Sequence, residues 1–147
     1  MPQFSKILCP VDFDQSSLAA VRVAADLAWE RNANLHLLHV LDPEAFSFGK
    51  IESAARTKLE RISRQKLKAG TRYELLVMIG DPAVEVLQAA TRLGIDLIVM
   101  ATHGRKGLRR LVLGSVAERV VREAQCPVLT VKPKAARAGP SRTRPRP

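Results

Sequence analysis

Residues 95–120 read IDLIVMATHGRKGLRRLVLGSVAERV. An apolar run ends at Ala101, three glycines and four basic residues follow, and a helical pattern begins at Ser115. A run that is apolar without alternation is typical of a parallel strand buried on both faces. The segment after it is either a long surface connection or an anion site, because the free N–H groups at a helix start attract anions.

The rest of the chain repeats this order of a strand and then a helix. Apolar strand candidates lie at 6–11, 35–41, 72–79, 95–101 and 127–131. Between them, apolar residues at helical spacing predict helices that start near residues 16, 51, 82 and 115. Strict alternation with short links predicts one doubly wound α/β domain, Rossmann-like, with a five-stranded parallel sheet and four helices.

Capping residues mark several of these helix ends. Ser16 or Ser17 is the expected N-cap of the first helix, and Asp81 is the expected N-cap of the third. Gly70 and Gly94 are the expected stops of the second and third helices, since glycine readily adopts the left-handed conformation that ends a helix.

Composition narrows the class of protein. The 147 residues suffice for one domain with a core, and 46% hydrophobic with only 4% aromatic residues predicts an aliphatic core. No apolar run approaches the roughly 18 residues of a membrane span, and the first residues lack a secretory pattern. Cys9 and Cys126 have no framework spacing and are expected to be buried and reduced. A cytoplasmic protein is expected.

The charge is unevenly distributed. The net charge is +10, and residues 132–147 hold six basic residues and no acid. Their Pro/Arg-rich composition predicts a disordered tail over 134–147, following a folded domain over 1–133. Nucleic acid is therefore an unexpected partner, except weakly through the tail.

Two strand ends carry the residues that suit a ligand. In doubly wound sheets, ligands bind beyond the carboxyl ends of the strands, where the strand order reverses. Asp12 follows the first strand, and the glycine-rich segment 101–114 follows the fourth, so neighbouring strands would bring both to one crevice. Ser115 and Glu118 also form a capping box, and Asp12 could cap the next helix; both alternatives stay open.

The glycine segment resembles the signature of the universal stress protein family, G-x2-G-x9-G-[ST]. Ala101 stands in place of the first glycine, and Gly104, Gly114 and Ser115 match the other positions. The flanking stretches KILCPVDFDQSSLAAV, GDPAVEVL and CPVLTVKP resemble the family's first strand, third-helix start and closing strand. The resemblance extends from Phe4 to about Lys132 and is closest to the ATP-binding, UspA-like type.

The resemblance implies the strand order 3-2-1-4-5 and a nucleotide between strands 1 and 4. Asp12 would accept from a ribose hydroxyl, and the bound cofactor would be ATP, with or without Mg²⁺. The implied binding residues are Pro10, Val11, Asp12, Val40, Met100, Ala101, Thr102, His103, Gly104, Arg105, Gly107, Gly114, Ser115 and Val116. The last strand, 127–131, would be an exposed edge, which predicts a homodimer through that strand.

Other classes of protein fit less well. A phosphoacceptor receiver domain would account for Asp12, Asp14 and Lys132, but it needs a fifth helix where this chain has the tail. A phosphate-transfer enzyme usually needs a G-x4-G-K-[ST] loop, which is absent. We expect an ATP-binding switch or partner-binding module of the stress response, with at most slow hydrolysis and no dedicated catalysis. The alternative is a dimeric, chaperone-like member that binds no nucleotide.

Overall fold

The computed structural model describes residues 3–44, 48–103 and 113–133. The predictions for Gly104, Arg105, Gly107 and the tail lie outside these residues. The elements in chain order are β1 (Lys6–Pro10), α1 (Gln15–Arg31), β2 (Asn34–Leu41), α2 (Phe48–Lys66), β3 (Tyr73–Ile79), α3 (Pro82–Leu93), β4 (Leu97–Ala101), α4 (Ser115–Glu123) and β5 (Val128–Val131). All strand pairs are parallel, and the order β3-β2-β1-β4-β5 confirms the expected topology.

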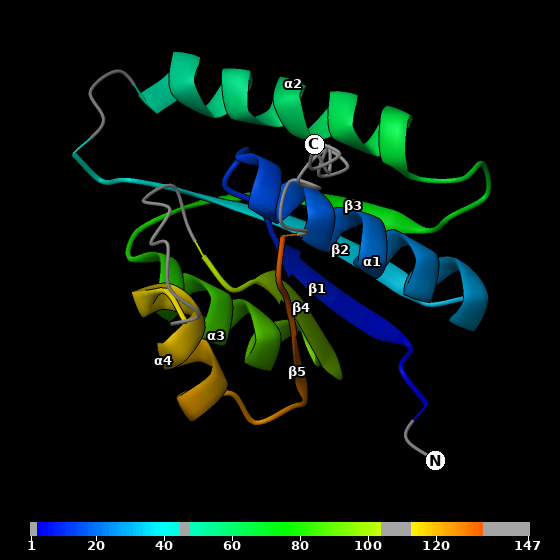
Figure 1. Cartoon of the computed structure of the whole chain (residues 1–147). Coiled ribbons are helices and arrows are strands. Elements are labelled where there is room, and N and C mark those ends of the chain that lie inside the picture. Colours follow the sequence, from blue (N-terminus) through cyan, green and yellow to red (C-terminus); the bar gives the residue numbers. More distant parts are fainter. Residues whose placement is uncertain (1–2, 45–47, 104–112, 134–147) are drawn as a thin grey trace, which may run out of the picture.

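Two helices cover each face of the sheet. α1 and α2 pack on one face, and α3 and α4 pack on the other (Figure 1). Successive residues of a strand enter opposite cores: Ile7 and Cys9 pack beneath α1, whereas Leu8 packs against α3 and α4. This double burial explains why the strands read as continuous apolar runs. None of the helices in the described part is both long and apolar enough to cross a membrane.

The start of α1 corrects one prediction. Its N-cap is Asp14, whose carboxylate accepts from the N–H of Ser17 at 2.9 Å, so the prediction of Ser16 or Ser17 as the cap is wrong. Ser17 is instead buried in the first turn, where its hydroxyl donates to the Asp14 carbonyl at 3.1 Å. Asp14 precedes both serines, and its carboxylate accepts from a free N–H of the first turn, so the helix begins before Ser16.

The ends of the next helices are closer to expectation. Asp81 accepts from the N–H of Val84 at 3.1 Å, and Gly94 ends α3 with a left-handed φ of 66°. α2 ends at Lys66, earlier than predicted, and Gly70 lies in the turn that follows. Both thiols are free, as expected, and Cys9 is buried. Cys126 is only half-buried, so the prediction that it is buried is wrong.

His36 is a polar residue inside this apolar fold. It is 4% exposed in β2, and neither ring nitrogen has a hydrogen-bond partner. The nearest acidic oxygen, Oε2 of Glu74, lies 3.6 Å from Nδ1. Burial lowers the pKa of His36, the positive charge of Lys6 adds to this, and the negative charge of Glu74 partly opposes it. The fold therefore holds this imidazole neutral.

We predict that His36→Leu reduces the acid sensitivity of the fold. Because the pKa of His36 is lower in the folded than in the unfolded chain, protonation favours unfolding as the pH falls below about 6.5. Between pH 6.5 and 5.0, the free energy of unfolding of the wild type should fall more steeply than that of His36→Leu, by up to about 1.4 kcal/mol per pH unit. Urea unfolding measures both. Equal losses in the two proteins would contradict the prediction.

Candidate functional site

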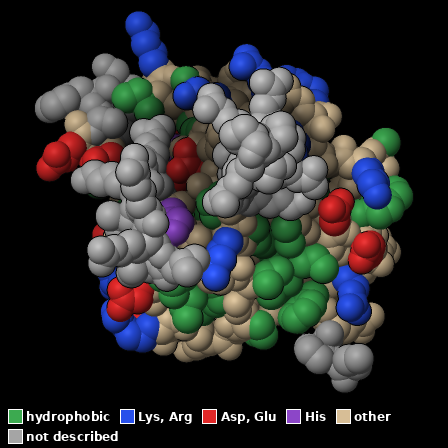
Figure 2. Space-filling model, in the orientation of Figure 1, with side chains coloured by type: hydrophobic (Ala, Val, Ile, Leu, Met, Phe, Trp, Pro, Cys, Tyr) green, Lys and Arg blue, Asp and Glu red, His purple; other side chains and the backbone are tan. Residues whose placement is uncertain are grey.

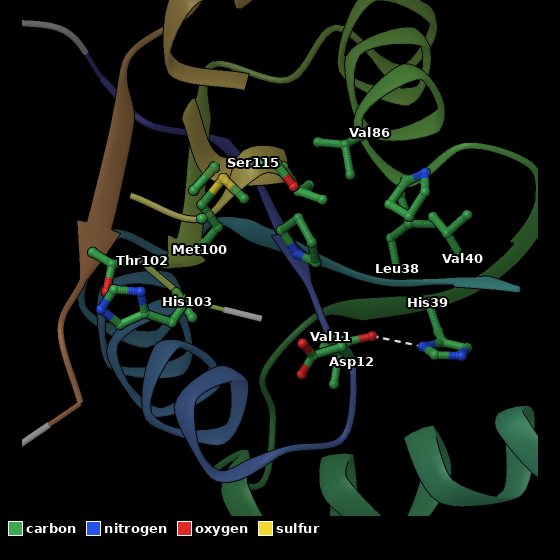
Figure 3. A pocket seen from close by; sticks show the side chains of 16 residues that line it. Val11, Asp12, Leu38, His39, Val40, Val86, Met100, Thr102, His103 and Ser115 are labelled. Atoms are coloured by element: carbon green, nitrogen blue, oxygen red, sulfur yellow. Dashed lines mark hydrogen bonds between the residues drawn. The ribbon is translucent and has the colours of Figure 1, made fainter. Parts of the chain in front are cut away.

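A cavity of about 500 Å³ opens at the carboxyl ends of β1, β2 and β4, against the starts of α3 and α4 (Figure 3). Its wall consists of Pro10, Val11, Asp12, Leu38, His39, Val40, Pro82, Val86, Met100, Ala101, Thr102, His103, Gly114, Ser115, Val116 and Ala117. All eleven predicted site residues that the structure describes lie in this wall. The volume is in the range of small-molecule sites.

The sequence did not single out five of these wall residues: Leu38, His39, Pro82, Val86 and Ala117. None of them belongs to the glycine motif. Leu38 and His39 precede Val40 in β2, and the other three lie in the first two turns of α3 and the first turn of α4. The packing of α3 against β2 and α4 brings Pro82 and Val86 to the cavity.

The cavity has an apolar end and a polar end. Leu38, Val40 and Val86 lie on one side, from β2 and α3 (Figure 3). Thr102 and His103 lie on the other side, beyond the end of β4 (Figure 3). A ligand with a flat apolar part and a polar or charged part matches this division.

Asp12 provides a carboxylate in the described wall. Its Oδ1 accepts from the N–H of Asp14 at 3.1 Å, and its own N–H donates to the Ser17 hydroxyl at 3.3 Å. Since Asp14 caps α1, the alternative that Asp12 is the helix cap is wrong. Burial raises the pKa of Asp14, the neighbouring Asp12 also raises it, and the bond from Ser17 N–H opposes them.

His39 fixes the turn that carries Asp12. Its Nδ1 donates to the carbonyl of Val11 at 2.7 Å, shown as the dashed line in Figure 3. The imidazole also stacks on Phe13, with ring centroids 4.3 Å apart, and Nζ of Lys58 from α2 lies 5.2 Å from the Phe13 centroid. Phe13 has a φ of 69°, a conformation that costs a bulky residue energy and needs such support.

The start of α4 forms another part of the wall. Gly114 is the N-cap and makes no side-chain cap hydrogen bond, while Ser115 is the first helical residue. The capping-box interpretation of Ser115 and Glu118 is therefore wrong, and Glu118 pairs with Arg122 at 3.4 Å instead. Ser115, Val116 and Ala117 present a helix N-terminus to the cavity, where unsatisfied N–H groups and the helix dipole favour an anion.

Ala101, which replaces a motif glycine, sits in regular strand geometry. It pairs with Val131 of β5, and it is not among the residues of the described chain with positive φ. Its methyl group packs with the core beneath α1, as do Cys9 and Val99. The backbone at this position therefore does not require glycine.

Thr102 and His103 carry unpaired polar atoms. Thr102 is 4% exposed, and neither its hydroxyl nor the buried Nδ1 of His103 has a hydrogen-bond partner. Figure 3 shows both side chains at the same end of the cavity. A buried hydroxyl without a partner costs about 1–3 kcal/mol, so this end of the cavity is built at the expense of stability.

We predict that Thr102→Val stabilises the ligand-free protein by about 1 kcal/mol, because valine keeps the shape and removes the unsatisfied hydroxyl. Urea unfolding measures the change. Thr102→Ser is the control: it keeps the hydroxyl, loses a buried methyl group and should be less stable than the wild type. A Thr102→Val protein less stable than the wild type would show that the hydroxyl is satisfied within the fold.

The fold and the cavity define a class of proteins: doubly wound α/β domains with a ligand cavity where the strand order reverses. The profile described as "Universal stress protein family" matches residues 3–132. The chain belongs to the universal stress protein family.

Individual relatives agree with this assignment. Universal stress protein MJ0531 of Methanocaldococcus jannaschii is 34% identical over 140 residues, covering 88% of this chain and 82% of the relative. The solved structure of MJ0577, from the same organism, superposes with a TM-score of 0.83 at 28% identity, covering 92% of this chain and all of that one.

Two further solved structures share the fold at lower identity. A universal stress protein in complex with cAMP has a TM-score of 0.69 and 24% identity, covering 89% of this chain and 98% of its own. The universal stress protein of Archaeoglobus fulgidus in complex with dAMP has a TM-score of 0.68 and 21% identity, covering 89% of this chain and 100% of its own.

Proposed function

We propose that this chain binds an adenine nucleotide, ATP, in the cavity and acts as a nucleotide-dependent switch or partner-binding module of the cytoplasmic stress response. The observation that carries the proposal is the cavity itself. An apolar end formed by β2 and α3 lies opposite a polar end formed by Thr102 and His103, and the start of α4 and Asp12 complete the wall. The complexes of related proteins with cAMP and dAMP support an adenine nucleotide.

The proposed orientation follows from the chemistry of the two ends. The base would lie among Leu38, Val40 and Val86, and the ribose hydroxyls would donate to the carboxylate of Asp12. The phosphates would meet the first turn of α4. Gly104, Arg105 and Gly107, from the remaining part of the signature, are proposed to complete the phosphate site.

Magnesium would enter with the triphosphate. Within the described residues, no group of three His, Cys, Asp or Glu side chains could hold a metal ion. Mg²⁺ usually keeps several waters and needs few protein carboxylates when phosphates coordinate it. The phosphates and water would therefore supply most of the ligands of such an ion.

We predict that denaturing the purified wild-type protein releases bound adenine nucleotide. Denaturing the Gly114→Trp variant should release none. Gly114 has a φ of −59°, which tryptophan can adopt, so the indole fills the cavity without backbone strain. With nucleotide at a hundred times its dissociation constant, the wild type should gain about 2.7 kcal/mol of stability, and Gly114→Trp should gain none.

Gly49→Trp is the matched control, because a side chain there meets open space on α2, away from the cavity. It should bind like the wild type in calorimetric titrations with ATP, cAMP and dAMP. A wild type that yields no nucleotide and shows no thermal shift with Mg-ATP would refute ATP binding. The chain would then be a dimeric interaction module without a nucleotide.

We also propose that the chain forms a homodimer through residues 127–131. β5 lies at one edge of the sheet, so its outer backbone groups have no strand partner in the described chain. Leu129 is 40% exposed on this strand. An apolar edge strand of this kind pairs readily with a second copy.

We predict that Leu129→Glu converts the dimer to a monomer, because it places like charges in the strand pair and removes apolar contact area. Light scattering after size exclusion at micromolar concentration measures the mass. Ile79→Glu is the control: Ile79 is 44% exposed at the end of β3, the opposite edge, and its variant should remain dimeric. A monomeric wild type would contradict the proposal.

A further inference from the structure

The positive charge of the described residues is concentrated on α2 and the turn after it. Residues 50–68 contain seven Lys or Arg and two Glu. The other described residues contain eight Lys or Arg against twelve Asp or Glu. Lys and Arg side chains follow the upper edge of the molecule, where Figure 1 places α2 (Figure 2). Residues 50–68 are therefore strongly basic and the other described residues are net acidic, and the two charges nearly cancel in the sum.

Three of these cations share one side of the helix, and a fourth follows its end. Ala55, Leu59 and Ile62 form the buried side of α2. Helical spacing places the opposite side along a line of exposed residues, which are Lys50, Ala54, Thr57, Arg61 and Arg64. The exposed Lys68 continues this line two residues after the helix ends. This line contains no acid, and we call it the α2 basic stripe.

The basic stripe lacks the ion pairs of an ordinary charged helix surface. On α4, Arg119 and Arg122 pair with acids four residues away. On α2, Glu60 stands four residues from both Arg56 and Arg64, and no ion pair of the described residues involves any of the three. Since solvated helix faces commonly carry such pairs, the unpaired stripe has capacity for an external anion.

An exposed aromatic ring adjoins the end of the stripe. Trp29, the single tryptophan of the chain, is 45% exposed at the end of α1. Nζ of Lys68 lies 5.6 Å from the centroid of its ring. The exposed Arg72 is nearby in the fold, with its guanidinium donating to the carbonyl of Asn32 at the C-cap of α1. Cations and an accessible ring are thus combined on one surface.

We propose that the α2 basic stripe and Trp29 bind single-stranded nucleic acid. Proteins that bind single strands combine a positive track for the phosphates with aromatic rings on which bases stack. The helical part of the stripe, from Lys50 to Arg64, extends over about 21 Å at 1.5 Å per residue, which is long enough for several phosphates. Trp29 at its end offers the stacking surface.

The composition of the stripe favours this partner over a membrane. Helices that lie in a lipid interface insert large apolar side chains such as Leu, Phe or Trp. The only uncharged residues along the α2 basic stripe are Ala54 and Thr57, which cannot insert deeply. The surface lies on the outer side of α2, whereas the cavity is walled by α3 and α4, so this activity is separate from nucleotide binding.

The test compares two triple variants of the full-length chain with equal loss of charge. The first is Arg61→Gln/Arg64→Gln/Lys68→Gln on the stripe. The second is Arg142→Gln/Arg144→Gln/Arg146→Gln in the basic tail, the main competing source of polyanion binding. The probe is a fluorescein-labelled 20-nucleotide oligo(dT), followed by anisotropy at several salt concentrations. Circular dichroism melting confirms that both variants are folded.

The stripe variant should bind the oligonucleotide at least ten-fold more weakly. The slope of log K against log salt concentration should fall in magnitude by about 2, because each phosphate contact with a single strand contributes about 0.7 to it. The tail variant should change less in both respects. Unlabelled oligo(dT) should quench Trp29 fluorescence, and Trp29→Leu should weaken binding about ten-fold. An equal or larger loss in the tail variant would overturn the proposal. So would unaltered Trp29 emission, or binding to phosphatidylserine vesicles but not to oligo(dT).

Discussion

The parallel pairing of β1 with β4 is the constraint on which the candidate site depends. Ile7 pairs with Leu97 and Leu8 with Ile98, and from this pair the chain continues outward in both directions of the sheet. β1 is followed by α1 on one face of the sheet, and β4 is followed by α4 on the other. The two connections therefore diverge and leave a crevice at the carboxyl ends of β1 and β4. The Asp12 turn and the start of α4 border this crevice because their strands are neighbours, not because they are close in sequence.

Much of this arrangement could be predicted, because the relevant signals are local. Buried strands appear in the sequence as apolar runs. Asp81-Pro82 and Gly94 mark the start and the end of α3, because capping depends on neighbouring backbone groups. The strand order needed the family resemblance. Without it, alternation of strands and helices indicates a doubly wound sheet and leaves the order of the strands open.

The errors and omissions arise where two segments compete or meet. Sequence alone could not decide whether Asp14 or a serine captures the first free N–H of α1. Nor could it show that His39 binds the Val11 carbonyl, since that contact joins residues 28 positions apart. The basic excess of residues 50–68 can be counted in the sequence, but the contact of Lys68 with Trp29 joins two elements and needed the fold.

The hydrogen bonds around Thr102 connect the two parts of the proposed function. The N–H of Thr102 donates to the carbonyl of Val131 in β5 at 3.1 Å, and its carbonyl accepts from the N–H of Gly114 at 2.7 Å. One residue therefore joins the edge strand proposed for dimerisation to the N-cap of the helix proposed to hold phosphates. Because both bonds involve backbone groups of a buried residue, a shift of α4 on ligand binding must be shared by β5 or break a buried hydrogen bond. That cost is the physical basis on which a nucleotide in the cavity would alter the dimer edge.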